Sequence, residues 1–136
     1  MRWFLVKMLA RSEAMYDPTA SIDHIEARFP EIAEILHDEI YEGLLHLQMA
    51  CFADMAQKVI DKGDEKQWHR VTETFIQIWV DCTPDVLNAL NVSFLEHLHF
   101  KDVKKAQSWA YKAMPAMMRE AWDDMDQYNR KIHGGE

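Results

Sequence analysis

The sequence contains few residues that interrupt helices, with four Gly and four Pro among its 136 residues. Cysteine is also scarce, because Cys51 and Cys82 are the only two, and both lie in apolar helical patterns. We expect both thiols to be buried and reduced, which argues against the disulfide framework of a small secreted domain. No stretch approaches the roughly 20 uncharged apolar residues that a membrane helix requires. A disulfide-stabilised fold and a membrane protein are therefore not expected.

The N-terminus briefly resembles a signal peptide, since residues 1–10 are mostly apolar. However, Lys7 interrupts the apolar run, and no small-residue cleavage site follows it. We therefore expect a cytoplasmic protein without a removable leader.

Bulky apolar side chains are abundant: five Trp, six Phe, four Tyr and nine Met contribute to a hydrophobic fraction of 49%. The length suits one domain with its own core, and the composition is globular rather than disordered. Apolar residues recur at three- and four-residue steps, and no alternating strand pattern is present. In the longest segment this spacing predicts one apolar, core-facing helical face, made of Leu36, Ile40, Leu44, Leu47, Cys51, Met55 and Val59. We predict an all-α fold over residues 1–136, a single-domain irregular bundle of about six or seven helices arranged as helical hairpins.

Capping and turn residues divide this pattern into helices. Ser21 is expected to cap the second helix, and Gly43 to kink the longest one. Gly63 and Asp64 form a stop followed by a new cap, and Pro84 stands at the first turn of a further helix. The predicted helices cover residues 2–15, 21–29, 31–62, 65–82, 84–100, 102–113 and 115–132, ahead of a frayed tail at 133–136.

The charge is unevenly distributed around a net value of −8, which would repel duplex nucleic acid and attract basic proteins. Residues 31–42 contain five acids and no base, and in one long helix four of these would form a strip of like charges. Such neighbours repel by a few tenths of a kcal/mol per pair. The strip is either an ordinary solvated face or a docking surface for a cationic protein. The candidate docking residues are Glu31, Glu34, Asp38, Glu39 and Glu42, extended by Asp123, Asp124 and Asp126 if the last helix lies alongside.

Catalytic machinery is not evident, since no glycine-rich elbow surrounds Ser21 or Ser93 and no phosphate-binding loop occurs. His46 is interpreted as a solvated histidine near Glu39 and Glu42. One enzymatic alternative is a di-iron carboxylate site, because paired Glu-x-x-His motifs reach one metal pair from a helix. Short N-terminal helices broken at proline argue against it. Its residues would be Glu34, His37, Glu96 and His99, with Glu13 and Glu73 as further carboxylates.

Three segments carry a resemblance to a known group of proteins: Phe29-Pro30-Glu31, Asn91 to Leu98, and Pro115 with Trp122. Together they resemble small all-helical bacterial proteins that include the immunity proteins of secreted and contact-dependent inhibition toxins. The resemblance covers roughly residues 20–128 and leaves the first helix, within residues 1–20, outside. It implies a cytoplasmic inhibitor that binds one basic toxin, often a nuclease, and that needs no cofactor and no catalytic residue.

The leading hypothesis is therefore an immunity protein that docks a cognate toxin electrostatically, rather than an enzyme. A di-metal enzyme and a self-associating adaptor domain are the two alternatives. The matching segments specify packing more than activity, so the resemblance transfers the fold more directly than the function.

Overall fold

The computed structural model describes residues 14–100 and 105–132, and within them it contains seven α-helices and no strand. This confirms the all-α prediction. The helix expected over residues 2–15 lies almost wholly outside the described residues, as do the helix start at residue 102 and the tail at 133–136. Residues 14 and 15, which belong to that first prediction, are not helical.

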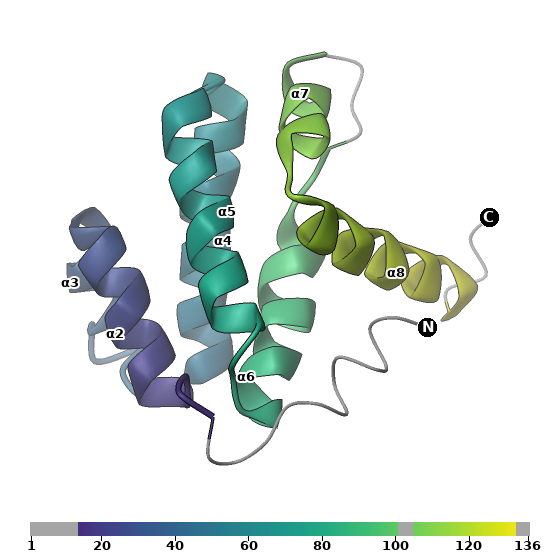
Figure 1. The fold of residues 1–136 in the computed structure, drawn as a ribbon. Helices are drawn as coiled ribbons and strands as arrows, with labels where there is room; N and C mark the ends of the chain where they lie inside the picture. Colours follow the sequence, from purple (N-terminus) through teal and green to yellow (C-terminus); the bar gives the residue numbers. More distant parts are fainter. Residues whose placement is uncertain (1–13, 101–104, 133–136) are drawn as a thin grey trace.

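The helices follow one another across the molecule from one side to the other (Figure 1). Near one side lie α2 and α3, next come α4 and α5, then α6 and α7, and α8 occupies the far side. Short 3₁₀ and π turns join some of them. The bounds are α2 Pro18–Arg28, η1 Pro30–Ile32, α3 Ala33–Leu36, α4 Leu45–Lys62, α5 Glu65–Trp79, α6 Pro84–Ala89, η2 Leu90–Phe94, η3 Leu95–His97, α7 Lys105–Ala113 and α8 Ala116–Ile132.

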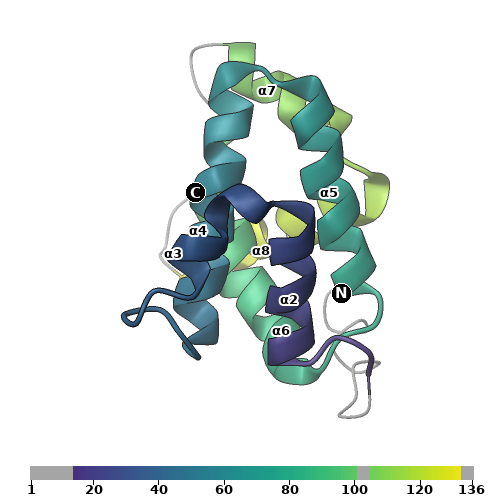
Figure 2. The ribbon, with the colours of Figure 1, turned by 90° about the vertical axis from the view of Figure 1, so that its left-hand side faces the viewer.

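Helices α4 and α5 form a hairpin, whose two limbs stand next to each other in Figure 2. Gly63 ends α4 with a φ of 72°, a left-handed conformation that glycine adopts at little cost. The Asp64 carboxylate then caps α5 by accepting a hydrogen bond of 3.1 Å from the Gln67 amide. This stop and cap confirm the boundary predicted from the sequence.

The buried apolar side chains form one connected cluster. At its centre the Phe94 ring stacks on Phe52 from α4 and on Phe75 from α5, with ring centroids 4.6 and 5.6 Å apart. A second aromatic group surrounds Phe100, which contacts Trp68 and Trp122. The π turn η2 therefore supplies the ring that joins the two limbs of the hairpin to the next part of the chain.

Two helix predictions are wrong: the cap at Ser21 and the single helix over residues 84–100. Asp17, not Ser21, caps α2 by accepting from the Ala20 amide at 2.9 Å, and Pro18 occupies the first turn. Ser21 is buried, and its hydroxyl donates to the Pro18 carbonyl. The segment after Pro84 is not one α-helix, because α6 ends at Ala89 and continues as the π turn η2 and the 3₁₀ turn η3.

The long helix predicted over residues 31–62 is also wrong, because helix α3 stops at Leu36 and α4 begins only at Leu45. Between them, the Asp38 carboxylate accepts from the Ile40 amide at 2.9 Å, a local bond that competes with helical pairing. Gly43 follows with a φ of 77°, so it takes part in a turn rather than kinking a helix. Ile40 is exposed as a result.

Helix α4 buries only part of the face that the sequence pattern indicated, namely Cys51 and Val59, together with positions outside that pattern. Met49, Phe52, Ala56 and Ile60 are fully buried, whereas Leu47 is exposed.

Among the described helices, none has both the length and the apolar character that a membrane crossing needs.

Candidate functional site

An exposed surface of mixed acidic and apolar side chains runs from the 3₁₀ turn η1 to the first turn of α4. We call it the 31–47 surface. Ile40 and Leu44 are 67% and 50% exposed, although their spacing predicted a buried face. Large apolar side chains grouped on a surface are typical of binding sites. The 31–47 surface consists of the acids Glu31, Glu34, Asp38, Glu39 and Glu42 and the exposed apolar residues Ile35, Ile40, Leu44 and Leu47.

The five acids predicted as docking residues are all exposed. The side chains of Glu31, Glu34 and Glu39 form no hydrogen bond or ion pair with another described residue. Residues 17–48 contain eight acids and one arginine, and that arginine is already paired with Glu73. The surface therefore keeps a negative charge that its own segment does not neutralise.

These acids do not form the single helical strip that the sequence predicted, because no helix spans them. Glu31 lies in η1, Glu34 in α3, and the other three in the turns after Leu36. The charges are thus carried by three consecutive short segments, which relieves the repulsion expected between neighbours on one helix face.

His37 holds the turn of this surface against α2. Its Nε2 lies 2.6 Å from Glu26 Oε1, and its Nδ1 lies 2.7 Å from Glu42 Oε1. The hydrogen bonds to Glu26 and Glu42 raise the pKa of His37 above its ordinary value. Glu42 is therefore a positioning residue with a partner among the described residues, unlike Glu34 or Glu39.

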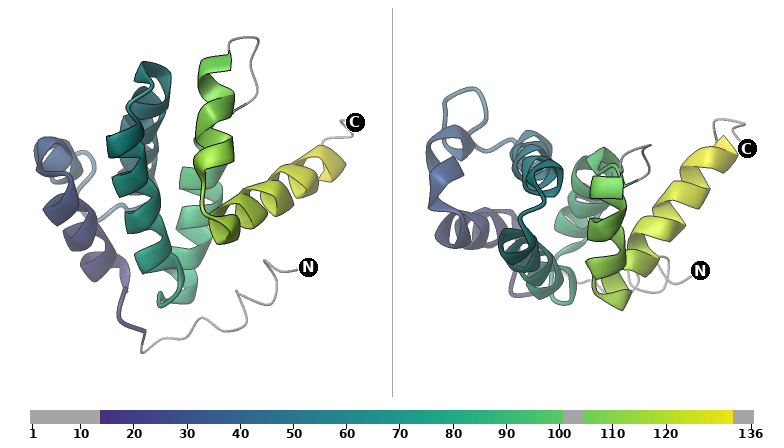
Figure 3. Two further views of the ribbon diagram at one scale, coloured as in Figure 1. Left: turned by 45° about the horizontal axis from the view of Figure 1, so that its top comes forward. Right: turned by 90° about the horizontal axis from the view of Figure 1, so that it is seen from above.

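The second predicted acidic cluster does not extend the surface. Helix α8 lies at the opposite end of the molecule from α3, as the view from above in Figure 3 shows. The Tyr111 hydroxyl bonds both oxygens of Asp123 at 2.8 and 3.0 Å, and Asp126 pairs with Arg130 at 3.0 Å. Asp124 is only half-exposed and also has an interaction partner. Asp123 and Asp126 therefore belong to the internal contacts of α7 and α8.

The residues of the di-iron alternative are not brought together either. Glu96 accepts from the Asn129 amide on α8 at 2.7 Å, and Glu73 pairs with Arg28. Glu13 lies outside the described residues. The described group that does place metal-binding atoms together is Asp23, Glu26 and His37, within 4.8 Å of one another.

The candidate nucleophiles occupy structural positions. Burial raises the pKa of Cys82 to about 12 and also raises the pKa of Cys51. A thiol with a raised pKa is a poor nucleophile at neutral pH. His46 is exposed, as expected, and its Nδ1 also contacts the buried Ser93 hydroxyl at 2.6 Å, which ties the start of α4 to η2.

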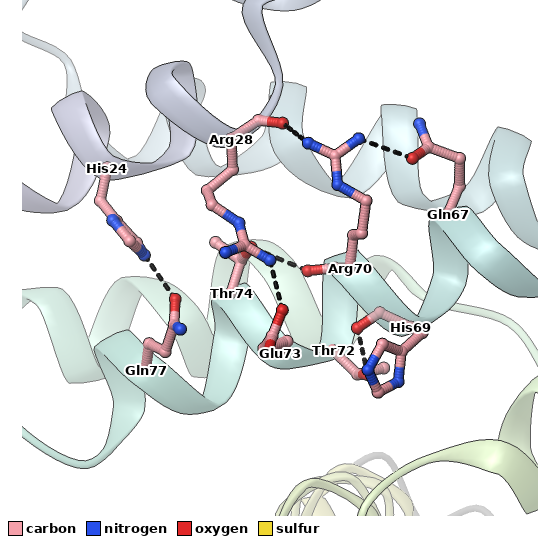
Figure 4. A network of polar contacts seen from close by, with 9 residues as sticks. All are labelled: His24, Arg28, Gln67, His69, Arg70, Thr72, Glu73, Thr74 and Gln77. Carbon is pink, nitrogen blue, oxygen red and sulfur yellow. Dashed lines mark hydrogen bonds and ion pairs between the residues drawn. The ribbon is translucent and has the colours of Figure 1, made fainter.

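A polar network attaches α2 to α5, which places the 31–47 surface relative to the core (Figure 4). Arg70 donates to the carbonyl of Arg28 at the end of α2 and, at 2.9 Å, to Gln67. Its guanidinium also lies 5.1 Å from the centre of the Phe29 ring. The Arg28 guanidinium bonds Glu73 and holds the pKa of that carboxyl below its ordinary value.

Replacing Arg70 by Ala is expected to lower the free energy of unfolding by about 1–3 kcal/mol, because a charged donor to a helix end is lost. Urea unfolding followed by circular dichroism measures this. Lys66→Ala is the matched control, since Lys66 is exposed one turn earlier on α5, and a change within about 0.5 kcal/mol is expected there. Equal effects of the two variants would contradict the role given to Arg70.

The fold and the surface define a small all-α protein domain with an acidic and partly apolar exposed face. The chain belongs to the family described as Domain of unknown function (DUF7674), whose sequence pattern matches residues 22–130. No curated protein and no solved structure matches the chain. The matched range contains the whole 31–47 surface. Because the family description assigns no function, the resemblance to immunity proteins stays a prediction.

Proposed function

We propose that this protein is an immunity protein, which binds a basic toxin domain through the 31–47 surface and thereby neutralises it. The observation that carries the proposal is the exposure of Ile40 and Leu44 among carboxylates that have few partners within residues 14–100 and 105–132. The sequence had indicated the charge but no apolar anchor for a partner. The exposed Ile40 and Leu44 side chains at the same place support such an anchor.

Apolar and charged side chains contribute differently to an interface of this composition. Apolar anchors at the centre of an interface contribute most of the affinity, and a polar rim surrounds them. Charges of one sign speed the encounter with a partner of the opposite sign and select against other partners. Glu31, Glu34 and Glu39 supply such charges beside Ile40 and Leu44, so the surface suits a partner with a basic rim around an apolar pocket.

A toxin that cleaves nucleic acid supplies the basic part of such a surface, since its substrate-binding cleft must be basic. An acidic domain bound across or beside that cleft excludes the substrate by its bulk and by its negative potential. This mode of inhibition needs no catalytic residue. It requires the inhibitor to be present in the compartment where the toxin acts, which we place in the cytoplasm.

Co-expression tests the proposal. If the gene directly upstream encodes a large secreted protein, its basic C-terminal domain is the partner to test. The full chain is expected to restore growth of cells that produce this domain and to form an equimolar complex with it, as measured by size-exclusion chromatography with light scattering. No protection, or a self-associated form of the chain that does not bind the domain, would overturn the proposal.

A charge-reversal pair identifies the surface. Glu34→Lys combined with Glu39→Lys is expected to slow association and to reduce its dependence on salt, because the steering charges are lost. Asp54→Lys combined with Glu65→Lys changes the net charge equally at exposed positions outside the surface. If both pairs weaken binding alike, overall charge rather than this surface determines the affinity.

A further inference from the structure

We propose that Asp23, Glu26 and His37 form a binding site for one divalent metal ion, and that Zn²⁺ is the ion that these donors suit best. This site differs from the Glu-x-x-His pairs considered above, because it joins α2 to the turn after α3. It does not depend on the proposed function. The site is built from two carboxylates and one imidazole, all of which reach solvent.

The local sequence explains why the three groups meet. Asp23 and Glu26 lie one helical turn apart on α2, so their side chains project from the same face. The chain then reverses through Phe29 and η1, which brings His37, directly after α3, back to that face. The candidate ligand atoms lie within 4.8 Å of one another.

The spacing is close to that of an occupied site. Zn²⁺ lies about 2.0–2.2 Å from imidazole nitrogen and carboxylate oxygen, so neighbouring ligand atoms in a tetrahedral site are roughly 3.3 Å apart. His37 Nε2 and Glu26 Oε1 are 2.6 Å apart. A small outward movement of partly exposed side chains is therefore sufficient, and the backbone need not change.

Glu42 gives the imidazole the orientation that metal binding requires. Its Oε1 lies 2.7 Å from His37 Nδ1, so Nδ1 keeps a proton while Nε2 faces Asp23 and Glu26. Histidine ligands of metals commonly donate their other ring N–H to a carboxylate in this way. Metal binding then replaces the proton on Nε2 with the cation, and the proton leaves to solvent.

The donor set also matches the charge and coordination of the ion. Two carboxylates balance the two positive charges, and the imidazole favours Zn²⁺ over Mg²⁺ or Ca²⁺, which prefer oxygen ligands alone. Three protein ligands leave a fourth position for water. Because Asp23 and Glu26 belong to α2, the ion would attach that helix to the turn that carries Ile40.

Isothermal titration of the metal-free full chain with ZnCl₂ tests the site. One equivalent per chain is expected to bind. Asp23→Asn, Glu26→Gln and His37→Asn are each expected to weaken binding at least about tenfold, as is Glu42→Gln through loss of the orienting carboxylate. His69→Asn and Glu34→Gln are controls, since both residues are exposed and lie outside the group. They should leave the affinity unchanged.

Thermal unfolding provides a second readout that does not depend on heat of binding. Added Zn²⁺ is expected to raise the Tm of the natural chain and of the two controls but not that of His37→Asn, because a ligand that binds only the folded state stabilises it. Circular dichroism without metal shows whether each variant is folded. Absence of saturable binding, or equal losses in His69→Asn and His37→Asn, would overturn the proposal.

Discussion

Replacing Phe94 by Ala is expected to lower the free energy of unfolding by about 3–5 kcal/mol, the usual effect of removing a buried phenyl ring. Phe94 is fully buried and stacks on Phe52 and Phe75, so its loss leaves a cavity between α4, α5 and η2. The stacked pairs add roughly 0.5–1.5 kcal/mol each beyond the burial of area. Urea unfolding followed by tryptophan fluorescence measures the change.

Two further variants make this result specific. Phe94→Leu keeps an apolar side chain in the same space and is expected to cost less than Phe94→Ala, so it remains measurable if the alanine variant does not fold. Val92→Ala alters an exposed residue of the same π turn and is expected to stay within about 0.5 kcal/mol. A cost for Val92→Ala as large as that for Phe94→Ala would show that the turn, rather than the ring, is responsible.

The helix boundaries that the sequence predicted well are those set by local chemistry. Gly63 and Asp64 end one helix and cap the next without help from distant residues, and Pro84 starts a helix because its fixed φ suits the first turn. Ser21 shows the limit of this reasoning. Asp17 and Pro18 provide an equally local start one turn earlier, and tertiary packing then buries Ser21.

The prediction of a long helix over residues 31–62 was wrong because apolar periodicity reports only the spacing of residues. It does not show whether local turns are more stable than the helix. Ile40 and Leu44 continue the apolar pattern of the preceding residues, yet the Asp38 side chain and Gly43 stabilise turns there. Repulsion among the neighbouring acids disfavours the helix as well. In the same way, nothing in the 3.6-residue pattern indicates that η2 widens into a π turn, which aims Phe94 into the core.

The candidate surface was half predicted. The acids of residues 31–42 can be counted from the sequence, and the negative charge of this segment is the same whether or not the predicted helix forms. The apolar residues of the surface could not be predicted, since the spacing of Ile40 and Leu44 assigned them to the core. Asp23 and Glu26 were missed because their meeting with His37 requires the chain reversal at Phe29. The Asp123 cluster was misjudged for a related reason, since the place of α8 follows from long-range packing.

Ile40 and Leu44 give the docking proposal its largest expected effect. Replacing both by Ala is expected to weaken binding of the basic toxin domain about a hundred- to a thousandfold, since central apolar anchors contribute about 2 kcal/mol or more each. Both residues are at least half exposed, so the free energy of unfolding is expected to change by no more than about 0.5 kcal/mol. Surface plasmon resonance with the purified toxin domain measures the rates.

The kinetic pattern separates the anchors from the charges. Loss of Ile40 and Leu44 is expected to accelerate dissociation and to leave the salt dependence of association intact, because the steering acids remain. Val80→Ala with Met117→Ala is the matched control, since these exposed apolar residues lie on other elements. If that pair weakens binding as much as the Ile40 and Leu44 pair does, or if neither pair has an effect, the partner does not dock on the 31–47 surface. The two double variants remove comparable apolar area from the surface of the protein. If only the Ile40 and Leu44 variant binds the toxin domain more weakly, the partner must bury this turn.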